Sequence, residues 1–192
     1  MRVIAGKYRS QFLASPKGWK TRPTSDRLRE TLFNVLAPRI EGSAFADLFA
    51  GTGAVGIEAF SRGARQVYFA ENAKPPLAAL NANLKKLRIG PEGHVEPASA
   101  LTMLRHLADQ RIRLDIVFLD PPYEDASAYQ TVLQFLGEEP ILAEQAIVIA
   151  EHARRTPLPV SIGQLERYRT IEQSESGLTF FRVNLLGGNR TV

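Results

Sequence analysis

Short apolar runs alternate with helical segments from residue 44 onward, and this alternation restricts the fold more than any other feature of the sequence. Five such runs are predicted strands: 44–49, 66–71, 94–99, 114–120 and 146–151. Helical segments between successive strands return the chain to the same edge of a sheet, so that the strands pair in parallel. The pattern therefore predicts an α/β fold with a doubly wound, mostly parallel, Rossmann-like sheet.

The C-terminal part of the chain departs from this alternation. Residues 164–173 and 177–186 each alternate between apolar and polar positions, and the sequence "SESG" lies between them. This arrangement is typical of an antiparallel hairpin. Its two strands, added to the five above, give an expected sheet of seven strands.

The first 40 residues are expected to form an extension that precedes the sheet. Residues 1–14 alternate weakly and indicate a small hairpin. A helix is predicted from about Thr24 to Pro38, with one apolar face: Leu28, Leu32, Val35 and Leu36. We accordingly expect an N-terminal extension (1–40), a main domain (41–187) and a flexible tail (188–192).

The positive charge of the protein is concentrated in this extension. Residues 1–40 contain nine lysines and arginines but only two acidic residues, whereas the remaining residues carry 15 basic and 18 acidic side chains. A basic extension on a slightly acidic body is typical of a nucleic-acid-binding protein. On the predicted helix, Arg27 and Arg29 are expected to lie largely outside the apolar face, free to contact a partner.

The composition excludes several classes of site. The chain has no cysteine, which excludes disulfides, thiolate zinc sites and a cysteine nucleophile. The three histidines (His94, His106 and His152) do not have the spacing of metal ligands, so we expect no metal. With 44% apolar residues, and without a signal peptide or an apolar run long enough to cross a membrane, a cytoplasmic protein is expected.

A glycine motif follows the first predicted strand of the main domain. The spacing Gly51-x-Gly53-x-x-Gly56 is typical of loops that bind nicotinamide or flavin dinucleotides. Ligands of doubly wound sheets lie beyond the carboxyl ends of the strands. Glu71, at the end of the next strand, is placed to accept hydrogen bonds from ribose hydroxyls. Since many adenosine-containing ligands share this contact, Glu71 does not identify the ligand.

Asp47 narrows the choice of ligand. It lies four residues before Gly51, in the sequence "DLFAGTG". A carboxylate at this position attracts a positively charged ligand group, such as the amino group of a methionine, and repels a pyrophosphate. The motif therefore favours S-adenosylmethionine over a dinucleotide.

A second motif, Asp120-Pro121-Pro122-Tyr123, ends the predicted strand 114–120 and thus lies at the ligand-binding edge. The Asp120 carboxylate and the Pro121 carbonyl can accept both hydrogens of an exocyclic amine, which localises the nitrogen lone pair for attack on a methyl group. Neither proline brings a competing N–H donor. Tyr123 can stack on the base. The alternative is an ordinary turn after a strand.

With these motifs in this order, the sequence resembles the RsmD-type methyltransferases, which use S-adenosylmethionine to methylate the N2 amine of a guanine in 16S ribosomal RNA. The most specific match is "RPTSDRLRETLFN" (22–34), and the resemblance extends from "RVIAGKYRS" to "FLDPPY" (118–123). It implies a class I methyltransferase fold, small-subunit ribosomal RNA as the partner and S-adenosylmethionine as the cofactor. We further expect a monomer without a membrane partner.

The resemblance also implies roles for individual residues. Cofactor contacts are expected from Asp47, Phe49, Gly51, Thr52, Gly53, Glu71, Asn72, Ser99, Arg22 and Thr24. The target amine is expected at Asp120, Pro121, Pro122 and Tyr123. The resemblance places Arg27 and Arg29 near the RNA or the cofactor, and the charge of the extension adds further expected RNA contacts: Lys7, Arg9, Lys17, Trp19 and Lys20. Ser99 can equally be a helix N-cap, and Trp19 can either stack on a base or anchor its loop.

Four other functions remain open. An adenine-N6 DNA methyltransferase or a glutamine methyltransferase presents the same amine to its cofactor. The glycine motif is also compatible with an NAD(P)-dependent oxidoreductase. A non-catalytic RNA-binding assembly factor would share the basic extension.

Overall fold

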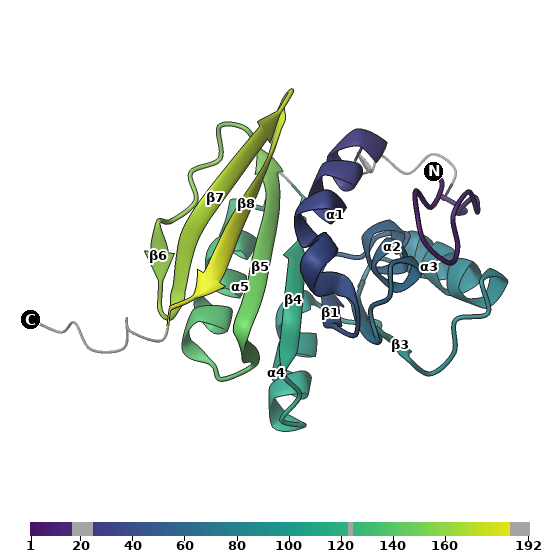
Figure 1. Ribbon diagram of the computed structural model, residues 1–192. Coiled ribbons are helices and arrows are strands. Elements are labelled where there is room, and N and C mark those ends of the chain that lie inside the picture. The colour runs from purple at the N-terminus through teal and green to yellow at the C-terminus, as the bar shows by residue number, and fades with distance from the viewer. Residues whose placement is uncertain (17–24, 123–124, 185–192) are drawn as a thin grey trace, which may run out of the picture. The chain divides into compact units, whose positions relative to one another are not determined.

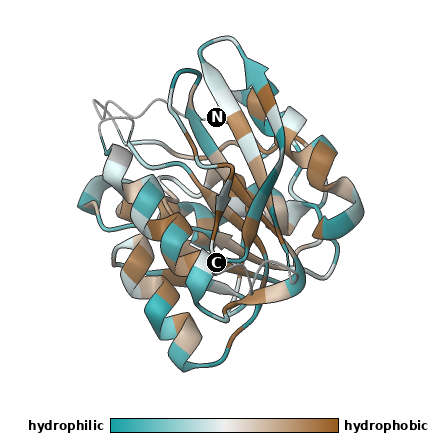
Figure 2. Cartoon of the chain, turned by 90° about the vertical axis from the view of Figure 1, so that its left-hand side faces the viewer, coloured by the Kyte–Doolittle hydropathy of each residue, from teal (hydrophilic) through white to brown (hydrophobic). Residues whose placement is uncertain are grey.

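The structure is a computed structural model that describes residues 1–16, 25–122 and 125–184. The chain divides into two compact units, Met1–Ser99 and Ala100–Val192. Strand and helix boundaries agree with the sequence pattern to within a few residues. Figure 2 shows apolar residues along the strands and alternating apolar and polar bands on the helices, as expected when only one face of a helix is buried.

The first unit contains three helices and three strands among its described residues (Figure 1). In chain order these are α1 (Asp26–Ile40), β1 (Ala44–Asp47), α2 (Ala54–Ser61), β2 (Gln66–Ala70), α3 (Lys74–Lys86) and β3 (Gly93–Glu96). Both strand pairs, β1–β2 and β2–β3, are parallel. Because Asp47 pairs with Phe69 and Ala70 with Glu96, the carboxyl ends of the three strands lie at one edge.

The packing of α2 against the strands depends on a glycine. A Cβ atom on Gly56 would overlap the ring of Phe69, which is itself fully buried on β2. The third glycine of the motif therefore allows close contact between helix and strand. Ile57 on α2 and Phe45 on β1 are likewise fully buried.

Helix α1 begins and ends close to the predicted positions. The Ser25 hydroxyl accepts a hydrogen bond from the Leu28 N–H at 3.1 Å and so caps the helix. Pro38 lies inside the helix, which continues to Ile40, so the predicted end at Pro38 was two residues early. A proline in the last turn is tolerated because it removes only one hydrogen bond near a frayed end.

The second unit contains the remaining elements: α4 (Ala100–Asp109), β4 (Leu114–Leu119), α5 (Ala126–Glu138), β5 (Leu142–Ala153), β6 (Ser161–Ile162), β7 (Leu165–Gln173) and β8 (Ser176–Val183). Its strand order is β4-β5-β8-β7-β6. Strands β4 and β5 are parallel, whereas β7 and β8 form the predicted antiparallel hairpin. The short strand β6 was not predicted, and with it the described residues contain eight strands instead of seven.

The N-terminal segment (residues 1–14) folds back on itself in the first unit. Arg2 and Phe12 form an isolated antiparallel bridge, and the Val3 N–H donates to the Gln11 carbonyl at 3.0 Å. The segment has only this one bridge rather than a regular two-stranded hairpin. Among the described residues, no helix combines the length and the apolar composition needed to span a membrane.

Candidate functional site

The glycine loop (residues 48–53) connects β1 to α2 at the carboxyl edge of the first unit's strands. Gly51 and Gly53 have φ angles of +54° and +82°, which side-chain-bearing residues rarely adopt. A Cβ on Gly53 would overlap the Leu80 side chain from α3, whereas a Cβ on Gly51 would meet no atom within 4 Å. Gly53 therefore serves packing, whereas the space beside Gly51 is open.

Glu71 links this loop to the end of β2. Its Oε2 accepts a hydrogen bond from the Gly51 N–H at 2.8 Å, and its Oε1 accepts one from the Ala73 N–H at 2.7 Å. Each carboxylate oxygen retains a further lone pair for a ligand hydroxyl. The half-buried Glu71 side chain thus lies next to Gly51, where the sequence predicted a ribose acceptor.

Asp47 is almost completely buried at the end of β1, with 2% of its surface exposed. Its Oδ2 accepts a hydrogen bond from the Gly56 N–H of α2 at 2.9 Å. Burial raises the pKa of Asp47 from 3.8 to about 7, and the nearby Glu71 charge adds to this effect, while the Gly56 hydrogen bond opposes it. Asp47 therefore holds the start of α2, and its contact with a cationic ligand stays a prediction.

The other expected cofactor residues of the first unit lie along the same edge of the strands. Phe49 and Thr52 belong to the glycine loop, and Asn72 and Ser99 are exposed residues that follow β2 and precede α4. Arg22 and Thr24 lie outside the described residues, as do Lys17, Trp19 and Lys20.

Sequence reasoning missed Asn83, a fully buried amide on α3. Its Nδ2 donates to the Thr52 carbonyl at 3.0 Å and to the Ala14 carbonyl at 3.1 Å, and its Oδ1 accepts from the Ala14 N–H at 2.7 Å. The signal was present in the sequence, because Asn83 lies three residues after Leu80 and so interrupts the apolar face of the helix.

In the second unit, the Asp120-Pro121-Pro122 sequence directly follows β4. Asp120 is partly exposed, Pro121 is buried and Pro122 is exposed. The Pro122 carbonyl accepts a hydrogen bond from the Asp125 N–H at 2.8 Å, and the Asp125 carboxylate caps α5. Asp120, Pro121 and Pro122 therefore directly follow β4, and the Pro122 carbonyl is bonded to the residue that caps α5. Tyr123 lies outside the described residues.

Basic side chains of the first unit surround a cavity of about 340 Å³. Arg2 and Arg9 from the N-terminal segment and Arg27 from α1 line it, together with Asp26 and Glu30. All three arginines are exposed, as is Lys7 nearby in the sequence. The cavity can therefore accept an anionic group, although two carboxylates moderate its charge.

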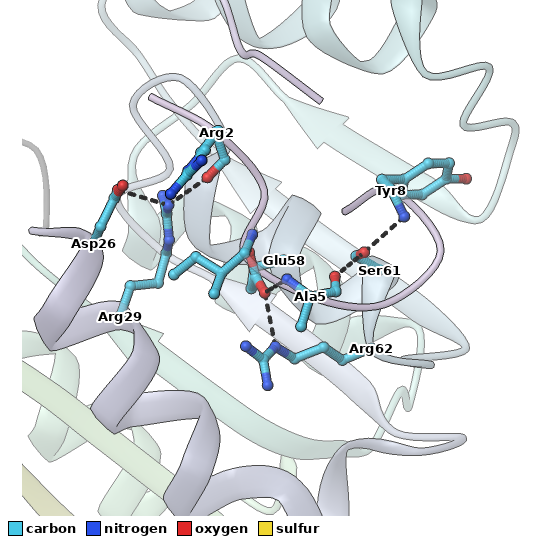
Figure 3. A network of polar contacts seen from close by, with 9 residues as sticks. Arg2, Ala5, Tyr8, Asp26, Arg29, Glu58, Ser61 and Arg62 are labelled. Atoms are coloured by element: carbon cyan, nitrogen blue, oxygen red, sulfur yellow. Dashed lines mark hydrogen bonds and ion pairs between the residues drawn. The ribbon is translucent and has the colours of Figure 1, made fainter. Parts of the chain in front are cut away.

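Arg29 does not belong to this exposed set, and the expectation that it is free to contact RNA was wrong. It is 0% exposed, and its Nη2 donates to the Arg2 carbonyl at 2.6 Å and to the Asp26 carboxylate at 3.0 Å (Figure 3). Among the described residues, Nε and Nη1 have no acceptor, and burial lowers the pKa of the guanidinium. The buried face of α1 includes Phe33, four residues after Arg29, so it is wider than the leucine pattern indicated.

Comparisons with known proteins agree with this architecture. The family model described as "Conserved hypothetical protein 95" matches residues 1–182. The Haemophilus influenzae protein named "Ribosomal RNA small subunit methyltransferase D" is 35% identical over 184 residues, which cover 95% of this chain and 92% of that protein.

Two solved structures share the fold. The Escherichia coli protein yhhF has a TM-score of 0.83 at 31% identity, over 96% of this chain and 98% of its own. SMU.776, solved in complex with SAH, has a TM-score of 0.61 at 15% identity, over 81% of this chain and 49% of its own. The fold is thus the Rossmann-like α/β fold of methyltransferases, and, given a family match over residues 1–182, the chain belongs to the RsmD family.

Proposed function

We propose that this protein transfers a methyl group from S-adenosylmethionine to the exocyclic N2 amine of a guanine in 16S ribosomal RNA. The observation that carries the proposal is the Asp120–Tyr123 sequence directly after β4 in a member of the RsmD family. The name of the Haemophilus influenzae relative supports small-subunit ribosomal RNA as the substrate class.

The first unit is proposed to bind the cofactor. S-adenosylmethionine supplies an electrophilic methyl group on a sulfonium sulfur. The open space at Gly51 and the Glu71 carboxylate beside it fit an adenosine ribose, and Asp47 offers negative charge to the methionine amino group. The remaining proposed cofactor contacts are Phe49, Thr52, Gly53, Asn72, Ser99, Arg22 and Thr24.

The second unit is proposed to hold the target amine. The Asp120 carboxylate and the Pro121 carbonyl accept its two hydrogens, so that the nitrogen lone pair is directed out of the base's π system. Nitrogen forms a bond to the methyl carbon as the carbon–sulfur bond breaks, and the fixed charge of Asp120 stabilises the positive charge on nitrogen. Asp120 is also the nearest proposed acceptor for the proton that nitrogen then loses. Pro122 keeps the turn rigid, and Tyr123 is proposed to stack on the guanine.

The basic extension is proposed to bind RNA phosphates. Exposed Lys7, Arg9 and Arg27 provide charge on the first unit, and the arginine-lined cavity is large enough for a phosphate group. Lys17, Trp19 and Lys20 are proposed to add contacts. If so, RNA affinity falls with salt by about 0.7 log units per log unit of salt for each single-strand phosphate contacted. A flat salt response would contradict this role.

The decisive experiment uses purified full-length protein and S-adenosylmethionine labelled in the methyl group. Ribosomal particles from a strain that lacks this modification are incubated with both, and the labelled nucleotide is mapped. Label on the N2 amine of one guanine in 16S RNA supports the proposal. Label recovered only from DNA or from a protein glutamine, or tight NADH binding without S-adenosylhomocysteine binding, would overturn it. Binding of RNA without transfer would favour an assembly factor.

A further inference from the structure

Asn83 joins the N-terminal segment to the glycine loop. The side chain is 0% exposed, and both of its donors and its acceptor are used by backbone groups. Two of these three hydrogen bonds are made with the N–H and the carbonyl of Ala14, and the third is made with the carbonyl of Thr52. A buried amide with all its partners present fixes geometry strongly, because any separation leaves buried polar groups unpaired.

Helix α3 contacts the same two segments through neighbouring side chains. Three residues before Asn83, Leu80 packs where a Cβ of Gly53 would otherwise lie. Three residues after it, the Lys86 ammonium donates to the Phe12 carbonyl at 2.7 Å. Since residues three apart lie on one face of a helix, a single face of α3 supports both the glycine loop and the end of the N-terminal segment.

Helix α2 holds the beginning of the N-terminal segment (Figure 3). The fully buried Glu58 carboxylate accepts hydrogen bonds from the Ile4 N–H at 2.7 Å and the Ala5 N–H at 2.9 Å. The Ser61 hydroxyl accepts from the Tyr8 N–H at 2.9 Å and donates to the Ala5 carbonyl. Helix α2 begins at Ala54, directly after the glycine loop. The two helices that contact this loop, α2 and α3, therefore also contact the N-terminal segment.

We propose that Asn83 is a positioning residue that couples the N-terminal segment to the glycine loop, so that nucleic acid bound to the segment and cofactor bound at the loop strengthen each other's binding. The inference rests on the proposed function of both surfaces. The cavity is lined by Arg9 of the segment and by Arg27 of α1, so an RNA phosphate held there contacts both elements and binds the docked segment more tightly than a displaced one. The docked segment fixes Asn83, which in turn fixes the Thr52 carbonyl and the conformation of the loop. Thermodynamic reciprocity then requires the cofactor to tighten RNA binding by the same factor.

The test measures a coupling factor, defined as the Kd of S-adenosylhomocysteine without RNA divided by its Kd with saturating RNA. Calorimetry on the full-length protein, with a transcript of small-subunit ribosomal RNA as the probe, gives both values. We expect a factor of about 5 to 50 in the unmodified protein, within the usual range of allosteric coupling. A factor of 1 in the unmodified protein overturns the inference.

Two variants remove hydrogen bonds between Asn83 and the N-terminal segment, one by a change on α3 and the other by a change in the segment. Asn83→Ala removes all three hydrogen bonds. Ala14→Pro removes the N–H group that donates to Asn83 Oδ1 and retains a carbonyl at position 14 as an acceptor for Nδ2. Both are expected to bring the coupling factor to about 1. Asn81→Ala is the matched control, since Asn81 is the same residue type on the same helix but is exposed. If Asn83→Ala does not fold, Ala14→Pro decides the question, and an unchanged factor in a folded variant overturns the inference.

The ratio separates coupling from a merely structural role. If Asn83 had only a structural role, Asn83→Ala would lower the stability and would weaken S-adenosylhomocysteine binding equally with and without RNA. The coupling factor would then stay unchanged. Hydrogen exchange adds a readout without RNA: S-adenosylhomocysteine is expected to slow exchange of the amides of residues 3–13 in the unmodified protein and not in Asn83→Ala. If methylation is normal but RNA and S-adenosylhomocysteine bind independently of each other, only the coupling is overturned. If the protein does not bind the cofactor at all, the proposed function itself is overturned.

Discussion

The Glu71 carboxylate accepts a hydrogen bond from the backbone N–H of Gly51 at 2.8 Å, across 20 residues of chain. This contact brings the acidic residue after β2 next to the glycine loop after β1. It stabilises a positive φ at Gly51 and leaves oxygen lone pairs beside the open space at that glycine. One side chain thus shapes the loop and is available to a ligand hydroxyl.

Replacing Glu71 by alanine is expected to weaken cofactor binding before it affects any other property. The change removes the proposed hydrogen bond from a ribose hydroxyl to a charged acceptor, worth about 1.5–3 kcal/mol, so the Kd of S-adenosylhomocysteine should rise roughly 10- to 100-fold. Isothermal titration calorimetry measures this Kd. Glu92→Ala, a change at an exposed acidic residue before β3, is the control. Equal affinities for both variants would remove Glu71 from the cofactor site.

Replacing Asp120 by alanine is expected to reduce turnover while cofactor affinity is largely retained. Loss of one group that stabilises transition-state charge typically lowers kcat by about 10²–10³. The measurement is the initial rate of methyl transfer at saturating cofactor and RNA. Asp109→Ala, at the exposed end of α4, controls for loss of surface charge. Normal turnover by Asp120→Ala would show that the amine is held by other groups.

Asp47 makes the stability of the protein depend on pH. Its pKa is 3.8 in the unfolded chain and about 7 in the folded protein, so the folded state binds more protons between these values. The contribution of Asp47 to the free energy of unfolding therefore falls as the pH rises from about 4 to 7, by roughly 4 kcal/mol in total. Asp47→Asn keeps an acceptor for the Gly56 N–H but cannot ionise.

Urea denaturation of both proteins at several pH values checks this expectation. The variant should gain stability relative to the unmodified protein as the pH rises through this range, and the difference should level off above about pH 8. A difference that does not change with pH would mean that Asp47 titrates normally.

The docking of the N-terminal segment depends on Gly6. Its φ is +80°, and a Cβ there would overlap the backbone carbonyl of Ser61. Gly6→Ala is expected to displace the segment and to lower the free energy of unfolding by about 1–3 kcal/mol beyond the cost of the positive φ itself.

Gly42→Ala measures the cost of a positive φ without a steric overlap. Gly42 also has a positive φ, +71°, but a Cβ there would meet no atom within 4 Å. Chemical denaturation compares the two variants, and limited proteolysis reports whether residues 1–14 become accessible. Equal stabilities and equal proteolysis would show that the contact with Ser61 does not hold the segment.

The sequence predicted the secondary structure of the main domain because each element carries its own periodicity. The apolar run predicted as a strand at 114–120 became β4, which ends at Leu119, and the alternating segments near the C-terminus became the β7–β8 hairpin. The two-residue strand β6 was missed because so short a strand has no periodicity to detect, and it depends on pairing with β7.

The candidate site was only partly predictable. The positions of Asp47, Glu71 and Asp120 followed from the rule that ligand-binding residues lie at the carboxyl ends of parallel strands. The roles of Arg29, Glu58 and Asn83 did not follow, because each makes contacts with the N-terminal segment, at least 27 residues away in sequence. Arg29 shows this most clearly, since a charged residue that the sequence assigned to an exposed face is fully buried.

Local sequence by itself determined the order and approximate positions of the main strands, the helices and the glycine loop, since backbone preferences and apolar periodicity act over a few residues. Only the tertiary structure decided which polar side chains are buried and bind the N-terminal segment to the helices. Burial of Glu58 and Asn83 is favourable only when backbone groups of the N-terminal segment form hydrogen bonds with them, and Nη2 of Arg29 likewise needs the Arg2 carbonyl. These backbone groups are in place only in the folded chain.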